Sequence, residues 1–75
     1  MISTIYVEPL AEGWAVRQAE VDNPQVFNSG AKAEDAALRL AQRLARAGKP
    51  SEVVVYLRNG AVGGRFACPA VGPNA

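Results

Sequence analysis

The fold is decided by residues 29–50, which read SGAKAEDAALRLAQRLARAGKP. Almost every residue in the middle of this stretch is a strong helix former. Ser29 stands ahead of them as a suitable N-cap, with Gly30 as the competing choice. Gly48 supplies the left-handed residue that commonly ends a helix. The stretch therefore predicts one helix over residues 31–47.

This helix is amphipathic, because at about 100° per residue its apolar and polar side chains fall on opposite faces. The apolar face consists of Ala33, Ala36, Ala37, Leu40, Leu44 and Ala47. The polar face consists of Lys32, Asp35, Arg39, Gln42, Arg43 and Arg46. Since the apolar face is mostly alanine, we expect the helix to pack close against a sheet.

Three short strands precede the helix. The segments Ile2–Glu8, Trp14–Val21 and Gln25–Asn28 are rich in β-branched and aromatic residues, which favour strands. Gly13 and Pro24 mark the turns between them. Short strands with tight connections predict an antiparallel meander.

A β-hairpin follows the helix. Asn59-Gly60 is a strong signal for a two-residue turn with positive φ at both positions. In that register Val53 faces Phe66, and directly opposed residues share a face of the sheet. One face carries Val53, Val55, Leu57, Val62 and Phe66, and the other carries Val54, Tyr56, Arg58, Ala61 and Arg65. The first set is wholly apolar, so we expect it to be buried beneath the helix.

These elements predict an α+β fold, a two-layer sandwich in the order β-β-β-α-β-β, in which one amphipathic helix covers one face of an antiparallel sheet. Seventy-five residues allow a single domain. We place it at residues 1–68 and expect residues 69–75 to be a flexible C-terminal tail.

The composition removes two of the usual ways to reinforce so small a core. Cys68 is the only cysteine and histidine is absent, so an internal disulfide is impossible and a zinc site lacks its usual ligands. We expect no metal and no cofactor. Association between chains is the remaining means of stabilisation.

Charge and hydropathy narrow the choice of partner. A formal net charge of +1 argues against an obligate binder of the phosphate backbone. The first residues lack a basic region and no long apolar stretch follows, so we expect neither a signal peptide nor a membrane span. The expected location is the bacterial cytoplasm, where the cysteine stays reduced.

The outer face of the sheet, away from the helix, carries the candidate site. Alternation along the strands assigns to it Tyr56, Arg58, Arg65, Val54, Arg17 and Tyr6. Tyrosine beside arginine suits a protein interface and also a platform for single-stranded nucleic acid. Val54 and Ala61 favour the interface because neither offers a base a specific contact. We expect a homodimer or a small protein partner, with nucleic acid as the alternative.

Other features have simpler interpretations. The basic stripe on the helix contains Asp35 four residues before Arg39, which predicts an ion pair on a solvated face. Gly63 and Gly64 lie inside a hairpin and indicate a bulge or a close approach rather than a phosphate loop. Cys68 has no histidine to activate it as a nucleophile. We therefore expect a non-enzymatic protein.

Several segments resemble a bacterial family known as domain of unknown function 2188. The resemblance covers roughly residues 5–66. It rests on Gly13-Trp14-Ala15-Val16, Val26-Phe27, Lys32-Ala33-Glu34-Asp35-Ala36-Ala37, Val53-Val54-Val55 and Asn59-Gly60-Ala61-Val62. These motifs are structural, and the family supplies no active site to carry over.

A second similarity is to the partial RNase H-like domain of HicB-type antitoxins, in which three strands also lead into a helix opened by an acidic and alanine-rich segment. Residues 30–37 resemble that helix entry. The chain lacks the separate DNA-binding segment that such antitoxins usually carry. Both resemblances imply a binding module.

Overall fold

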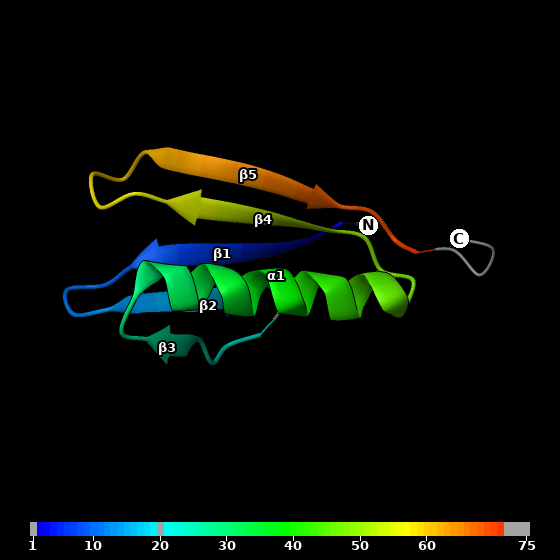
Figure 1. The fold of residues 1–75 in the computed structure, drawn as a ribbon, viewed down its shortest axis with the longest axis horizontal. Helices are drawn as coiled ribbons and strands as arrows, with labels where there is room; N and C mark the ends of the chain where they lie inside the picture. Colours follow the sequence, from blue (N-terminus) through cyan, green and yellow to red (C-terminus); the bar gives the residue numbers. More distant parts are fainter. Residues whose placement is uncertain (1, 20, 72–75) are drawn as a thin grey trace.

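The computed structural model describes residues 2–19 and 21–71, which form one helix and five strands (Figure 1). The elements are β1 (Ser3–Pro9), β2 (Trp14–Gln18), β3 (Gln25–Phe27), α1 (Gly30–Arg46), β4 (Ser51–Tyr56) and β5 (Val62–Cys68). Their order confirms the predicted α+β arrangement, with the helix lying across one face of a single sheet.

The sheet has the strand order β3-β2-β1-β4-β5, and it is mixed rather than antiparallel. β1 and β4 pair in parallel, whereas the other three pairs are antiparallel. β1 and β4 are parallel because of the direction in which the helix carries the chain. β3 runs the same way as β1, and the helix carries the chain back to the end where both began, as a parallel crossover requires. β4 then starts beside β1 and must run with it.

The central position of β4 fits its sequence. Val53 and Val54 point to opposite faces, yet both are buried. Val53 is covered by α1 in the core, whereas Val54 is covered on the outer face by neighbouring side chains, since it lies between Tyr6 of β1 and Arg65 of β5.

The ends of α1 agree with the predicted caps. Ser29 Oγ accepts a hydrogen bond from the Lys32 amide at 3.1 Å, which confirms Ser29 as the N-cap. At the other end Gly48 has φ of +81°, and the Lys49 amide donates to the Leu44 carbonyl at 2.8 Å. The bond from C″ to C3 belongs to a Schellman motif.

Alanine forms the contact between α1 and the sheet. The fully buried residues of the helix are Ala33, Ala37, Ala41 and Ala45. They pack on Ile5, Val7, Val16 and Val53 from three neighbouring strands. The predicted core face is therefore corrected by a small rotation, because Ala41 and Ala45 lie at its centre while Ala47 is exposed. Leu40 and Leu44 are half-buried along its flank.

The turn of the C-terminal hairpin is one residue longer than predicted. Only Gly60 has positive φ, at +88°, and the Leu57 amide donates to the Ala61 carbonyl at 2.8 Å. The loop therefore has three residues, a common hairpin connection. A bulge follows at Gly63, so that Tyr56 pairs with Val62 and Val55 with Gly64.

The extra loop residue and the bulge offset each other. From Val55 to Val53 the strand keeps the predicted partners, ending with Phe66 opposite Val53. Nearer the turn the faces change, and Val62 lies opposite Tyr56 on the outer side. The prediction that the whole apolar set is buried is wrong. Val55 is half-buried, but Leu57, Val62 and Phe66 are 45%, 43% and 44% exposed. Val62 lies on the face away from the helix, and Leu57 and Phe66 are left uncovered because α1 lies mainly over β1, β2 and β4 (Figure 1).

The chain after β5 returns to the helix. The Val71 amide donates to the Ala45 carbonyl at 2.9 Å. Of the predicted tail, residues 72–75 lie outside the described residues.

The alanine contact predicts how the core responds to extra volume. Ala37 is fully buried between helix and sheet, so Ala37→Leu should lower the free energy of unfolding by about 1–3 kcal/mol through overpacking. Ala31→Leu, at an exposed position of the same helix, should stay within about 0.5 kcal/mol of wild type. Urea denaturation followed by circular dichroism measures both, and equal losses would contradict the packing described.

Candidate protein-interaction site

The outer face of the sheet brings most of the predicted residues into one row. Tyr6 lies beside Arg17 on β2 and beside Val54 on β4. Val54 in turn lies beside Arg65 on β5. The row therefore crosses four strands, as alternation along the chain predicts. Tyr56, two residues after Val54 on β4, adds to the same face.

The aromatic side chains of this face stack on one another. The rings of Tyr6 and Tyr56 have centroids 6.2 Å apart and planes inclined by 21°. The Arg17 guanidinium lies over the Tyr6 ring, with its carbon 4.3 Å from the centroid. Stacked aromatic pairs and cation–π contacts of this geometry are favourable. The three side chains form a continuous layer across β2, β1 and β4.

Each arginine of the outer face is paired with a glutamate. Arg17 donates to Glu8 at 2.8 Å, and this hydrogen bond raises the pKa of the Arg17 guanidinium above its ordinary value. Arg65 lies 3.4 Å from a Glu52 carboxylate oxygen. Two positive and two negative side chains therefore stand together, and the described part of this face has no excess of positive charge.

Arg58 does not belong to the outer face, which corrects its predicted position. Its guanidinium donates to the Leu10 carbonyl at 2.8 Å and lies over the Trp14 ring, 5.2 Å from its centroid. Trp14 is on the helix side, where its ring lies against Gly30. Arg58 lies in the lengthened hairpin loop and connects it to the loop between β1 and β2.

At its centre the outer face offers little open apolar surface, since Val54 is only 3% exposed. Three of the exposed large apolar side chains, Leu57, Val62 and Phe66, lie on the C-terminal hairpin. We call Leu57 and Phe66, which lie on the helix side beside Gly63 and Gly64, the hairpin patch, whereas Val62 lies on the outer face opposite Tyr56. The sequence predicts that these three residues are buried. The structure differs because β5 is the last strand of the sheet and is the strand that α1 covers least, and because the bulge at Gly63 turns Val62 to the outer face.

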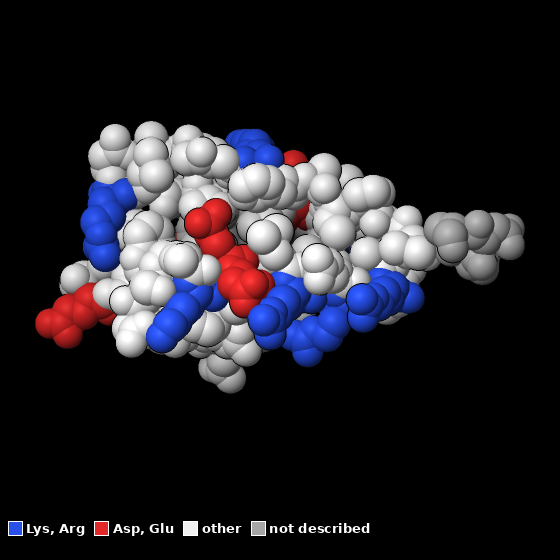
Figure 2. Space-filling model, viewed as in Figure 1, with Lys and Arg blue, Asp and Glu red and all other residues white. Residues whose placement is uncertain are grey.

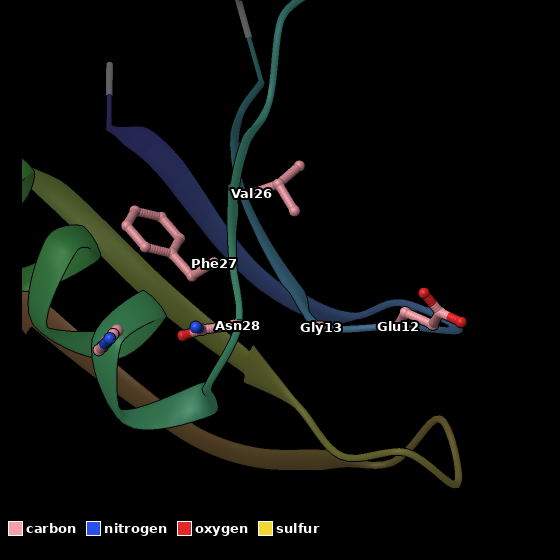
Figure 3. Close-up of a pocket in the computed structure, with 6 residues that line it drawn as sticks. Glu12, Gly13, Val26, Phe27 and Asn28 are labelled. Carbon is pink, nitrogen blue, oxygen red and sulfur yellow. The ribbon is translucent and has the colours of Figure 1, made fainter.

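Two other surface features, an open hollow and the basic stripe of α1, do not bring polar groups together into a binding site. An open hollow beside the loop between β1 and β2 is lined by Glu12, Gly13, Val26, Phe27, Asn28 and Lys32. Figure 3 shows the Phe27 ring turned toward α1 and Val26 turned to the opposite side, with Glu12 far from Asn28. Its polar groups therefore do not face a common point.

The basic stripe of α1 is a solvated face. Figure 2 shows basic side chains in a row along the helix, while the surface over β4 and β5 on this side is mostly uncharged. Arg39 pairs with Asp35 at 3.0 Å, as the spacing predicts, and both side chains are largely exposed. Ion pairs of this kind contribute little to stability.

Within residues 2–19 and 21–71, no helix combines the length and the apolar composition that a membrane crossing requires. The same residues contain no group of three or more acidic, cysteine or histidine side chains placed to hold a metal ion.

Comparison with known proteins identifies the class of the chain. A family model described as an uncharacterized protein conserved in bacteria, DUF2188, matches residues 5–68. The chain belongs to this family, which confirms the first of the two resemblances. No curated protein and no solved structure matches it.

The outer-face stack predicts the effect of removing a tyrosine. Tyr56 and Tyr6 are the aromatic neighbours of Val54 on this face, so Tyr56→Ala should lower the free energy of unfolding by about 1–2 kcal/mol. The molar mass in solution should not change. Tyr56→Phe, which keeps the ring, is the matched control. Light scattering and urea denaturation measure the two quantities, and a loss of association without a loss of stability would contradict this role.

Proposed function

We propose that this member of DUF2188 is a non-enzymatic protein-interaction module that assembles as a homodimer in the bacterial cytoplasm. The observation that carries the proposal is the hairpin patch, in which two large apolar side chains beside the adjacent Gly63 and Gly64 are each more than two-fifths exposed. Contiguous apolar surface on a small protein is characteristic of a binding site.

The size of the core supports association. The large side chains that are fully buried are Ile5, Val7 and Val53, and the helix adds only alanines. A domain of this size buries only about 60% of the surface of its unfolded chain. Covering the hairpin patch with a second chain would add apolar burial that the monomer lacks.

The charge pattern argues against the alternative, a single-strand nucleic-acid platform on the outer face. Such platforms combine stacking rings with arginines that are free to meet phosphates. Here Arg17 and Arg65 are each engaged by a glutamate, and Arg58 lies elsewhere. The tyrosine rings stack on each other rather than standing open to a base.

An antitoxin of the HicB type is a further alternative within the class of binding modules. The similarity of residues 30–37 to the helix entry of that family supports this alternative. Such a protein would bind a toxin partner, and a toxin encoded next to this chain would favour it over an independent homodimer.

The proposed assembly predicts a concentration-dependent molar mass. Light scattering after size-exclusion chromatography should give about twice the 7.9 kDa of the monomer at high concentration, and the melting temperature should fall on dilution because dissociation accompanies unfolding. A fluorescent single-stranded oligonucleotide should not bind at physiological salt. A protein that stays monomeric at high concentration and binds the oligonucleotide in a salt-sensitive manner would overturn the proposal and favour the nucleic-acid alternative.

A further inference from the structure

The two edges of the sheet differ in a way that matters for association. β3 forms one edge and has three residues, whereas β5 forms the other and has seven. A very short strand is one way in which proteins protect an edge, and lysine or proline on the strand is another. β5 contains neither, and Arg65 is its only charged residue. The bulge at Gly63 interrupts only the start of the strand, and no other described segment pairs with its outer side. From Gly64 to Cys68 its outer row of backbone donors and acceptors is therefore open to another strand.

We propose that β5 pairs with β5 of a second copy in antiparallel orientation, about a two-fold axis that passes between the two Phe66 residues. This proposal rests on the proposed homodimer and identifies the surface by which it forms. The two sheets would join into one continuous sheet of ten strands, with both helices on the same side. A symmetric contact of this kind uses the same patch on both subunits.

The bulge and the charge select this register. Regular strand geometry holds from Gly64 to Cys68, on the far side of the bulge at Gly63. A register centred on Arg65 would set two arginines directly opposite each other, which is unfavourable. Centring on Phe66 sets the two rings opposite each other on the helix side instead. Arg65 then lies beside Ala67 of the partner subunit, whose small side chain leaves space on the outer side.

Charge complementarity supports a second copy as the occupant. Ala67 lies opposite Glu52 within the subunit, so the Arg65 side chain, which is 62% exposed, can extend over Ala67 of the partner subunit toward Glu52 of the partner subunit. The two-fold axis repeats this contact. Each Arg65 would then stand between two glutamates, its own and the partner subunit's Glu52.

The helix side of β5 provides apolar surface for the same contact. Cys68 Sγ donates to the Ala41 carbonyl and the Val71 amide to the Ala45 carbonyl, so this flank of α1 faces β5. Leu38, three residues before Ala41, shares that flank and is 40% exposed. Leu57 and Phe66 are exposed on the same side of the sheet, beside the adjacent Gly63 and Gly64. In the dimer these side chains line one groove between the two helices, with the Phe66 pair at its centre.

In the proposed register Gly64 lies directly opposite Cys68 of the partner subunit. A disulfide between these two positions therefore tests the register. Directly opposed residues have Cα atoms about 4.5–5.5 Å apart, within the range that a disulfide bridges. The same two positions within one chain are about 13 Å apart along the strand, too far to be joined. A Cβ at Gly64 meets only the Phe66 ring, at 3.5 Å, so Gly64→Cys is tolerated.

Under mild oxidation with copper phenanthroline, Gly64→Cys in the full chain should convert to a covalent dimer on a denaturing non-reducing gel. The wild type and the double variant Gly64→Cys with Cys68→Ser should remain monomeric on the same gel, because each leaves one thiol per chain without an opposite partner. Equal cross-linking in the single and double variants would overturn the register.

A second pair of variants measures the affinity without a new thiol. Phe66→Glu sets two carboxylates at the two-fold axis and should raise the dimer dissociation constant about tenfold or more. Val26→Glu, on the opposite edge at a residue that is 63% exposed, should change it less than about twofold. A wild type that is dimeric and indifferent to Phe66→Glu would overturn the β5 contact and leave the homodimer standing. A wild type that is monomeric at every concentration would overturn both.

Discussion

The close approach of one alanine-faced helix to the sheet is the constraint on which the rest of the structure depends. Ala33, Ala37, Ala41 and Ala45 allow the helix to lie directly on the valines and isoleucine of β1, β2 and β4. A helix is about 10 Å wide, whereas five strands at about 4.8 Å spacing extend over roughly 19 Å. One helix therefore cannot cover every strand. The strand that it covers least is β5, and the exposure of Phe66 on this strand follows from the mismatch of widths.

The helix caps and the faces of the strands could be predicted from the sequence because they depend on residues that are close together in the chain. Ser29 marks the start of the helix through its side-chain oxygen and Gly48 marks the end through its positive φ, and alternation places Tyr6, Arg17 and Tyr56 on one face. Features that depend on elements far apart in the chain could not be predicted in this way. The parallel pairing of β1 with β4 depends on where the helix delivers the chain. The exposure of Phe66 depends on how far the helix extends over the sheet, and the position of Arg58 depends on one extra residue in a loop.

The candidate site also combines features that could be predicted from the sequence with features that could not. Alternation alone brings Tyr6, Val54 and Arg65 together, but it says nothing about their partners. Glu8 and Glu52 neutralise the two arginines of this face, and the tyrosines stack on each other. A face that appears from the sequence to be open and basic is internally satisfied in the structure. The surface that lacks partners within the described residues is instead the apolar hairpin together with the long edge of β5. The contact expected between two chains is therefore strand pairing along the edge of the sheet and not packing between two sheet faces.

We infer that the β5 edge is open in the monomer and paired in the dimer. Hydrogen–deuterium exchange of the backbone amides at low and high protein concentration tests it most directly, because edge amides exchange quickly unless another strand binds them. We predict that β5 amides become protected as the concentration rises, while β3 amides exchange equally at both. Exchange in β5 that is fast and independent of concentration, in a protein that light scattering shows to be dimeric, would contradict the account.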